Sequence, residues 1–442
     1  MVKKLVPYFL ILFCVLPALL PLYSNSVLGS ADNLAHLFRI VNLDYALQQG
    51  YLWPRWAALE GHGFGAPIFN FNYIFPYYLT VGLWHATASL IHGSQLYMML
   101  VLVVSAFSMY SFITEFFGIA SAVVSAIVYV YFPYHLMTVY LYGSYGEALA
   151  FALVPLVLKF LYRFLYNHSF SSFLLATCSL VLLILSHNLS AIMAIALMVT
   201  MTPLCWHCNK EKMRTMMSTI GVVLTASLIT AWFWLPALLE SNYTKLGILF
   251  EKETALRDYF FHVIEPVIEN SWKLLQLEAP SYYSYAIGIP SIILVVFAVL
   301  LLMKQGISIF RNARKSKFIS LWIVGLYFIS WCVLSFLMTK SVSEPLWSLL
   351  PARLNFFSYP YRFFFITTFS IAGITAYVLH IVWNHVDKRG AFTLSAIVTS
   401  LFVWQGYMYT HPAIDRFFLP MNTLSPPKQY DMPPTPLKTW DT

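Results

Sequence analysis

Charged side chains are scarce in this chain: Asp, Glu, Lys and Arg make up 10% of its 442 residues, whereas hydrophobic residues make up 60%. A soluble domain carries about 25% charged residues, so the composition excludes a water-soluble globule. The mean hydropathy of +0.70 indicates the same. The net charge of +8 could suggest a nucleic-acid partner. We predict none, because the basic residues are placed as membrane proteins place them, as shown below.

Paired cysteines are also rare. Of the five, only Cys205 and Cys208 lie close together, in CWHC, and no second Cys or His pair with ligand spacing accompanies them. A zinc or redox centre is therefore not predicted. Strict polar–apolar alternation is missing as well, which disfavours a membrane β-barrel. What is present is a series of continuous apolar runs of roughly 20 residues, each able to cross about 30 Å of hydrocarbon.

These runs predict an all-α polytopic membrane protein with about eleven transmembrane helices. The transmembrane module covers residues 1–409, and the first span is expected to remain as an anchor, because no A-x-A cleavage site follows it. The segment 74–92 contains Pro76, His85 and His92 and is predicted to be re-entrant or interfacial. The predicted spans are 5–23, 95–114, 119–134, 147–166, 170–185, 189–205, 216–236, 286–303, 318–338, 362–383 and 391–409.

The basic residues predict the orientation. Short loops rich in Lys and Arg stay in the cytoplasm, and an eleven-span layout puts all five basic clusters on the same side as the N-terminus. The inside then has a charge balance of +11 and the outside one of −3. If 74–92 crossed fully, every later basic cluster would face outward. The clusters are Lys3–Lys4, Lys159 with Arg163, Lys210 to Arg214, Lys304 to Lys317, and Lys388–Arg389.

Three outer stretches are long enough to build a site. The first outer loop is 24–73, and the second, 237–285, is predicted to form one or two amphipathic helices over the bundle. The tail 410–442 is rich in proline and is predicted to be an extended strap or disordered. No solenoid or transporter repeat is evident in the sequence.

The first outer loop contains the most informative motif. Asp32, His36 and Arg39 are spaced i, i+4 and i+7, so they share one face of a helix, and Ser30 could cap it. A carboxylate can take up a proton, and a guanidinium can grip phosphate with paired donors. The same spacing also fits a solvated helix face with an i, i+4 pair.

Farther along this loop, Trp53-Pro54-Arg55-Trp56 precedes His62, which is flanked by glycines at 61, 63 and 65. Such glycines can let backbone N–H groups approach an anion, or they can form a plain turn. The two tryptophans fit a membrane-interface belt.

Four ionisable residues from later parts of the chain fall on the same predicted outer surface. Charged groups at membrane depth are costly and tend to be functional. Each also has an ordinary structural interpretation, as a helix cap, a satisfied histidine or a snorkelling arginine. Their convergence on one side favours a site. They are Glu147 in YGSYGEALA, His187 in SHNLSA, Arg353 between two spans, and Arg362 in SYPYRFFF.

Together these segments resemble the bacterial membrane proteins described as 6-pyruvoyl-tetrahydropterin synthase-related, a family similar to the GT-C integral-membrane glycosyltransferases. The soluble pterin enzyme is a poor guide, because the zinc-binding histidine set it needs is missing here. The segments that carry the resemblance are ADNLAHLFRI (31–40), WPRW (53–56), EGHGFGAPIFNFNYIFPYYL (60–79), YGSYGEALAFALVPL (142–156), SHNLSA (186–191) and YPYRFF (359–364).

The resemblance implies a GT-C-like fold in the bacterial inner membrane, with the N-terminus in the cytoplasm. It implies a transferase that moves a sugar from a polyprenyl-phosphate donor to an outer acceptor of unknown identity, with inversion. Asp32 would be the catalytic acid, with Glu147 as a second carboxylate. Asn33 and Leu34 follow Asp32, so the D-x-D pair of many relatives is absent, and a divalent metal remains possible but unassigned. Donor phosphate or substrate would contact His36, Arg39, Arg55, His62, His187, Arg353, Tyr359 and Arg362.

Two other functions remain open from the sequence. A lipid-carrier or solute transporter would place paired charges near the bilayer midplane, whereas here they gather at helix ends. A non-catalytic subunit of envelope polysaccharide assembly would be compatible with the incomplete acidic motif.

Overall fold

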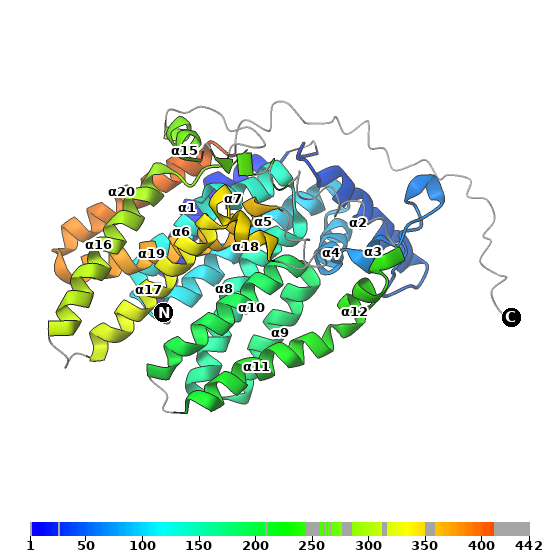
Figure 1. The fold of residues 1–442 in the computed structure, drawn as a ribbon. Coiled ribbons are helices and arrows are strands. Elements are labelled where there is room, and N and C mark those ends of the chain that lie inside the picture. The colour runs from blue at the N-terminus through cyan, green and yellow to red at the C-terminus, as the bar shows by residue number, and fades with distance from the viewer. Residues whose placement is uncertain are drawn as a thin grey trace.

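The structure is a computed structural model that describes residues 2–24, 27–207, 211–243, 257, 259, 261–262, 264–265, 267–275, 285–311, 316–349 and 359–410. Within these ranges it is built of helices (Figure 1), with one isolated bridge between Ala57 and Ala66. The all-α polytopic class predicted from the sequence is confirmed. Arg353, Cys208, most of 244–284 and the tail from 411 onward lie outside the described residues.

The first half of the chain contains α1 (Val2–Leu19), η1 (Leu20–Leu22), α2 (Asn33–Gln48), η2 (Gly61–Gly63), α3 (Ile68–Phe71), α4 (Phe75–Thr87), α5 (Leu90–Ile113), α6 (Ile119–Tyr131), α7 (Pro133–Met137), η3 (Thr138–Tyr142), α8 (Tyr145–Asn167), α9 (Phe170–Ser186), α10 (Asn188–Met201) and η4 (Thr202–His207). The second half contains α11 (Lys212–Ile229), α12 (Ala231–Leu239), η5 (Ser241–Tyr243), α15 (Val267–Leu275), α16 (Ile289–Arg311), α17 (Ser316–Leu337), η6 (Ser341–Ser343), α18 (Glu344–Ser348), η8 (Pro360–Phe363), α19 (Phe364–His385) and α20 (Lys388–Tyr407).

Seven helices in the described part of the chain are long and apolar enough to cross a membrane. The number rises to nine if two bent pairs each count as one span: α6 with α7 and η3, bent by 47°, and α11 with α12, bent by 72°. Of the other predicted spans, α9 has only 17 residues and α20 is less apolar. The count of eleven therefore remains a prediction.

The segment 74–92 forms a short helix, α4, followed by the start of α5. Its 13 residues measure about 20 Å at 1.5 Å per residue, less than the roughly 30 Å of a hydrocarbon core. Ala88 adopts a left-handed conformation just after α4, and Ser89 then caps α5 by accepting a hydrogen bond from the His92 N–H. This geometry agrees with the predicted re-entrant or interfacial segment, which remains a prediction.

The centre of the bundle is formed by α19 and α8, whose apolar stretches are 89% and 67% buried, compared with 22% for α16. Small residues allow close packing, as is usual between membrane helices. A side chain on Gly373 of α19 would collide with the ring of Phe328 on α17. Polar side chains also join helices here, since the Ser125 hydroxyl donates to the Ala372 carbonyl at 2.7 Å.

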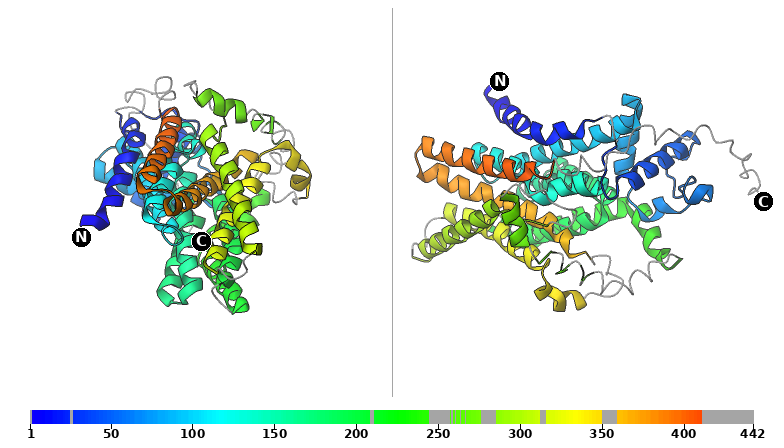
Figure 2. Two further views of the ribbon diagram at one scale, coloured as in Figure 1. Left: turned by 90° about the vertical axis from the view of Figure 1, so that its left-hand side faces the viewer. Right: turned by 90° about the horizontal axis from the view of Figure 1, so that it is seen from above.

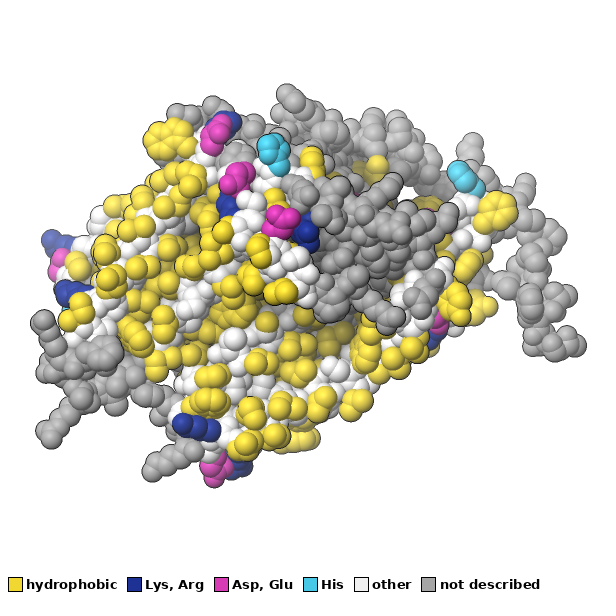
Figure 3. Space-filling model, in the orientation of Figure 1, with side chains coloured by type: hydrophobic (Ala, Val, Ile, Leu, Met, Phe, Trp, Pro, Cys, Tyr) yellow, Lys and Arg dark blue, Asp and Glu magenta, His cyan; other side chains and the backbone are white. Residues whose placement is uncertain are grey.

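The outer surface of the bundle is apolar. Large hydrophobic side chains such as Phe9, Phe13, Leu228 and Phe392 are exposed. Figure 3 shows hydrophobic side chains spread over the coloured part of the visible face, with few charged side chains among them. Because soluble monomers rarely expose such extensive apolar surface, this surface is the expected contact with lipid.

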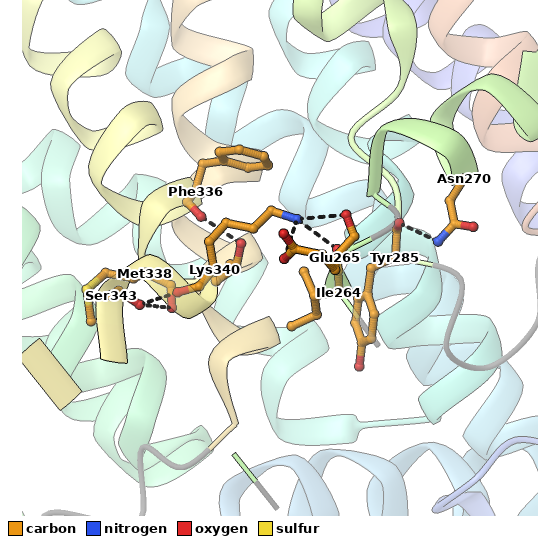
Figure 4. A network of polar contacts seen from close by, with 9 residues as sticks. Ile264, Glu265, Asn270, Tyr285, Phe336, Met338, Lys340 and Ser343 are labelled. Atoms are coloured by element: carbon orange, nitrogen blue, oxygen red, sulfur yellow. Dashed lines mark hydrogen bonds and ion pairs between the residues drawn. The ribbon is translucent and has the colours of Figure 1, made fainter. Parts of the chain in front are cut away.

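The two ends of the bundle differ. One end carries α2, α3, α4 and α12, whereas the other carries the N-terminus, the end of α16 and the start of α17 (Figures 1 and 2). The first is called the α2 end below. Of the second predicted outer loop, α15 is described. Beside it, Lys340 donates to the carbonyls of Ile264 and Glu265 at 2.9 and 3.1 Å (Figure 4), which ties this loop to the segment after α17.

Candidate functional site

The candidate site begins where the chain enters α2. The N–H groups of Ala31 and Asp32 donate to the carbonyls of Leu141 and Tyr142 at 2.9 and 3.0 Å. Asp32 is therefore the N-cap residue of α2, and its side chain makes no capping hydrogen bond. The expectation that Ser30 caps this helix is wrong, because the backbone pairing with η3 makes the helix begin after Asp32.

The carboxylate of Asp32 lies within electrostatic range of two guanidinium groups. Partial burial raises the pKa of Asp32, while the positive charges of Arg39 and Arg362 lower it in part. Arg39 is seven residues along the same helix, whereas Arg362 arrives from the start of α19. Solvent still reaches the Asp32 side chain, and the two cations act on its carboxylate from different elements.

His36 is buried within a group of tyrosines. Its Nδ1 lies 2.7 Å from Tyr77 Oη and 3.5 Å from Arg39 Nη1. A guanidinium can only donate hydrogen bonds, so Nδ1 accepts and the ring proton is on Nε2, which lies 3.4 Å from Tyr73 Oη. Burial, and secondarily the charge of Arg39, lowers the pKa of His36 to about 3. The imidazole is therefore neutral at ordinary pH.

Glu147 lies in the first turn of α8, after a break in the preceding span. The π-helical turn η3 ends at Gly143, whose φ is +63°, and α8 begins at Tyr145. π-helical turns often mark functional sites. Glu147 is buried, and its Oε1 accepts a hydrogen bond from Tyr134 Oη at 2.8 Å. A carboxylate at a helix N-terminus is also stabilised by the helix dipole.

Arg362 connects these groups. It lies in η8, which Pro360 begins and which leads directly into α19. Its Cζ lies 4.8 Å from the centroid of the Tyr359 ring, a cation–π contact. Arg362 interacts electrostatically with Glu147 and with Asp32. The two carboxylates predicted to be catalytic thus both lie within electrostatic range of one guanidinium.

His187 lies at the junction of α9 and α10. Its Nδ1 accepts a hydrogen bond from the Ser190 N–H at 3.3 Å and lies 2.8 Å from Ser190 Oγ, so the side chain caps α10. The ring also packs against Tyr73, with centroids 5.9 Å apart, and Arg362 lies within electrostatic range. His187 therefore has a structural role as the cap of α10, and it also lies beside the candidate site.

The predicted site residues divide into three groups. The structure brings together Asp32, His36, Arg39, Glu147, His187, Tyr359 and Arg362 at the α2 end. Arg55 is apart from them, paired with Glu240 at 3.6 Å. His62 is exposed in the turn η2, with a φ of +61°, and Arg353 lies outside the described residues.

Sequence reasoning named Tyr359 but missed the other tyrosines of this site. Rings of Tyr73, Tyr77 and Tyr145 surround His36, with centroids 5.3 to 5.9 Å from it. Tyr134 holds Glu147, and Tyr361 stacks on Tyr142 at 5.8 Å. Helical spacing gave no signal for Tyr73, which lies before α4 begins at Phe75.

Metal ligands are not grouped at this site. Among the residues that the structure describes, no three His, Cys, Asp or Glu side chains are arranged to hold a metal ion. The protein groups that could stabilise a phosphate here are the guanidiniums of Arg39 and Arg362 and the hydroxyls of the tyrosines.

Gly146 permits the close packing beneath the site. A Cβ at this position would lie 2.6 Å from Tyr73 Cε1 and would collide with the Ser186 carbonyl. We expect Gly146→Ala to destabilise the protein by about 1–3 kcal/mol, as overpacking does, and to displace Tyr73 from His36. The matched control is Gly221→Ala in α11, where a Cβ meets nothing within 4 Å. Thermal unfolding in detergent should show a lower midpoint for Gly146→Ala alone.

Comparison with known families gives one match over most of the chain. A family described as "6-pyruvoyl-tetrahydropterin synthase related domain; membrane protein" matches residues 69–408. The matched range includes Glu147, His187 and Arg362 but begins after α2. Among curated proteins, no sequence matches this chain.

Three solved structures illustrate the similarity. The oligosaccharyltransferase of Archaeoglobus fulgidus in the apo form has 11% identity and a TM-score of 0.47, over 95% of this chain and 57% of that one. Arabinofuranosyltransferase AftD from Mycobacteria has 14% identity and a TM-score of 0.48, over 91% of this chain and 26% of that one. ArnT from Cupriavidus metallidurans bound to undecaprenyl phosphate has 11% identity and a TM-score of 0.40, over 83% of this chain and 77% of that one. The chain thus spans about half of the archaeal protein and a quarter of the mycobacterial one.

Proposed function

The chain belongs to the family of membrane proteins described as 6-pyruvoyl-tetrahydropterin synthase related, and we propose that it is a membrane-embedded glycosyltransferase. It moves a sugar from a polyprenyl-phosphate donor to an acceptor hydroxyl at the α2 end. The donor class comes from the sequence resemblance to the GT-C enzymes. A lipid donor also suits the apolar outer surface, because such a substrate enters sideways from the bilayer.

The observation that carries the proposal is the interaction of Arg362 with both Asp32 and Glu147. These residues come from the first loop, from α8 and from the start of α19, so the fold brings together groups that are far apart in the sequence. A general base and a fixed cation are the two groups that displacement of a phosphate by a hydroxyl requires. A purely structural ion pair would need one cation and one carboxylate, whereas here one cation acts on carboxylates from two other segments.

In the proposed step, the Asp32 carboxylate takes the proton of the acceptor hydroxyl. The hydroxyl oxygen forms the new bond to the anomeric carbon as the bond from that carbon to the lipid phosphate oxygen breaks. The phosphate leaves with the electron pair, so the anomeric configuration inverts. Arg362 and Arg39 stabilise the developing phosphate charge, because fixed charges need no reorganisation as the reaction proceeds.

The other predicted residues have supporting roles. Glu147, held by Tyr134, orients Arg362 and the acceptor. The neutral His36 supplies a hydrogen bond and not a charge. His187 holds the Tyr73 ring in place by packing against it. The α2 end faces out of a bacterial cytoplasm and the N-terminus faces in, as the basic loops predict.

The proposal is tested with the full chain in lipid nanodiscs. A set of radiolabelled undecaprenyl-phosphate sugars is added with extracted envelope glycans and lipids as acceptors. We expect release of undecaprenyl phosphate together with labelled product from at least one donor. Binding and vesicle transport of a donor without covalent product would contradict the proposal and identify a transporter instead.

The pH dependence of transfer gives a second test. A general base works only when ionised, so the rate falls as pH falls through the pKa of Asp32, which burial raises. We expect the acidic limb of kcat/KM to lie above the ordinary range for an aspartate. No inflection near pH 6.5 is expected from His36, whose pKa is lowered to about 3. An inflection at that pH that disappears in His36→Gln would disprove the neutral role of His36.

A further inference from the structure

A second polar and aromatic feature lies beside the candidate site. It is a cleft of about 380 Å³ between the first outer loop, α3 and the start of α12, called the aromatic cleft below. Small-molecule sites commonly have volumes of roughly 300–1,000 Å³ and combine an aromatic lining with a few polar groups. The cleft is lined by Trp53, Pro54, Arg55, Phe69, Asn70, Ile74, Trp232 and Phe233.

Two indole rings form its accessible wall. Trp53 and Trp232 pack edge to face, with centroids 5.1 Å apart and planes at 62°. Trp53 is 66% exposed and Trp232 45% exposed, although they come from elements about 180 residues apart. Indoles offer a flat apolar face and one polar N–H, which suits a ligand with one apolar face and a polar edge.

The polar edge of the cleft is formed around Glu240, next to the lining residues. Its Oε2 accepts a hydrogen bond from Asn70 Nδ2 at 2.7 Å, and its Oε1 lies 3.6 Å from Arg55 Nη1. Arg55 and Glu240 are both about half exposed. Their charges cancel, and among the described lining residues Arg55 is the single charged one. The cleft therefore favours a neutral ligand with many hydroxyl groups over an anionic lipid head group.

The aromatic cleft adjoins the candidate site along the chain. Phe69, which lines the cleft, packs against Tyr77 with centroids 6.5 Å apart, and Tyr77 contacts His36. Ile74, another lining residue, directly follows Tyr73. The cleft and the candidate site are therefore neighbours, with the buried rings of Phe69 and Tyr77 between them.

We propose that the aromatic cleft binds a neutral saccharide and is the acceptor subsite of this protein. Sugar rings stack their C–H faces on Trp53 and Trp232, while Arg55, Glu240 and Asn70 bond the hydroxyls. The role as acceptor subsite rests on the proposed function, whereas saccharide binding does not. A membrane-interface belt would need the apolar wall but would gain nothing from the three linked polar groups.

The test uses the full chain in nanodiscs on an array of neutral, amino and pentose oligosaccharides, followed by titration of the strongest glycan. We expect binding in the millimolar range that weakens at least tenfold in Trp53→Ala and Trp232→Ala. Trp404→Ala is the matched control, because Trp404 is 50% exposed on α20 and belongs to neither site. Thermal unfolding shows which variants remain folded. Because Trp53 is the more exposed of the two cleft tryptophans, Trp53→Ala should disturb the fold least.

Three outcomes would overturn the inference: no array glycan bound, equal binding by the parent and both cleft variants, or quenching of Trp53 and Trp232 by brominated lipid without glycan binding. The last would assign the aromatics to the bilayer interface. Asp32→Asn separates the two proposals, since it should keep glycan binding while losing transfer. If Asp32→Asn keeps transfer, the proposed function fails and saccharide binding by the cleft still stands.

Discussion

Replacement of Asp32 by Asn is expected to reduce sugar transfer by about 10²- to 10⁴-fold, the usual contribution of a positioned general base. Asn has nearly the same shape but cannot take up a proton. The side chain of Asp32 makes no capping hydrogen bond, so the substitution should leave α2 in place. Initial rates at saturating donor and acceptor, with donor binding measured separately, provide the measurement.

The control for this prediction is another acid on the same helix. Asp44 is buried in α2, and its Oδ1 lies 2.7 Å from His85 Nε2 on α4. It lies about three turns along α2 from Asp32. Asp44→Asn should weaken the contact between α2 and α4 without removing the proton acceptor, so transfer should remain near the parental rate. Equal loss of activity in both variants would mean that Asp32 acts through the fold and not as the base.

Replacement of Arg362 by Gln is expected to reduce transfer by about 10²- to 10³-fold, the cost of losing one preorganised group that stabilises developing charge. It should also lower stability, because the buried Glu147 loses a positive charge that favours its ionised form. Arg362→Lys should recover stability better than activity, because Lys lacks the planar fork that grips phosphate. Transfer rates and thermal unfolding, measured together, separate the two effects.

A double variant separates chemistry from folding. Arg362→Gln with Glu147→Gln removes both charges, so stability should return toward the parent while transfer stays low. Arg163→Gln is the matched control, because Arg163 pairs with Glu115 at 2.7 Å at the opposite end of the bundle and is half exposed. Such exposed pairs contribute about 0–1 kcal/mol. Recovery of transfer in the double variant would remove Arg362 from the proposed chemistry.

Several features of the fold could be predicted from the sequence, because they depend on short-range periodicity and composition. The apolar runs predicted α1, α5, α8, α10, α16, α17 and α19 as membrane helices. The bent pairs were harder to predict, since the bend between Ile229 and Ala231 has no proline at the break. The count of spans depends on such breaks, so eleven remains a prediction.

The candidate site could be predicted only in part. The i, i+4, i+7 spacing placed Asp32, His36 and Arg39 on one face, and the structure has His36 and Arg39 within 3.5 Å. The partners of that face could not be predicted in detail, because they come from residues more than 30 positions away. Tyr73, Tyr77 and Tyr145 reach His36 only because α4 and α8 pack against α2.

The sequence by itself determined that this protein is a helical membrane protein, because burying so many apolar residues in water-free surroundings requires backbone hydrogen bonds within each segment. It also determined which side chains share the face of α2. Only the tertiary structure decided that Arg362 comes within electrostatic range of both Asp32 and Glu147, and that the ring of Trp53 packs against that of Trp232. The reason is physical: a helix fixes neighbours three and four residues apart, whereas contacts between distant segments depend on how whole helices pack.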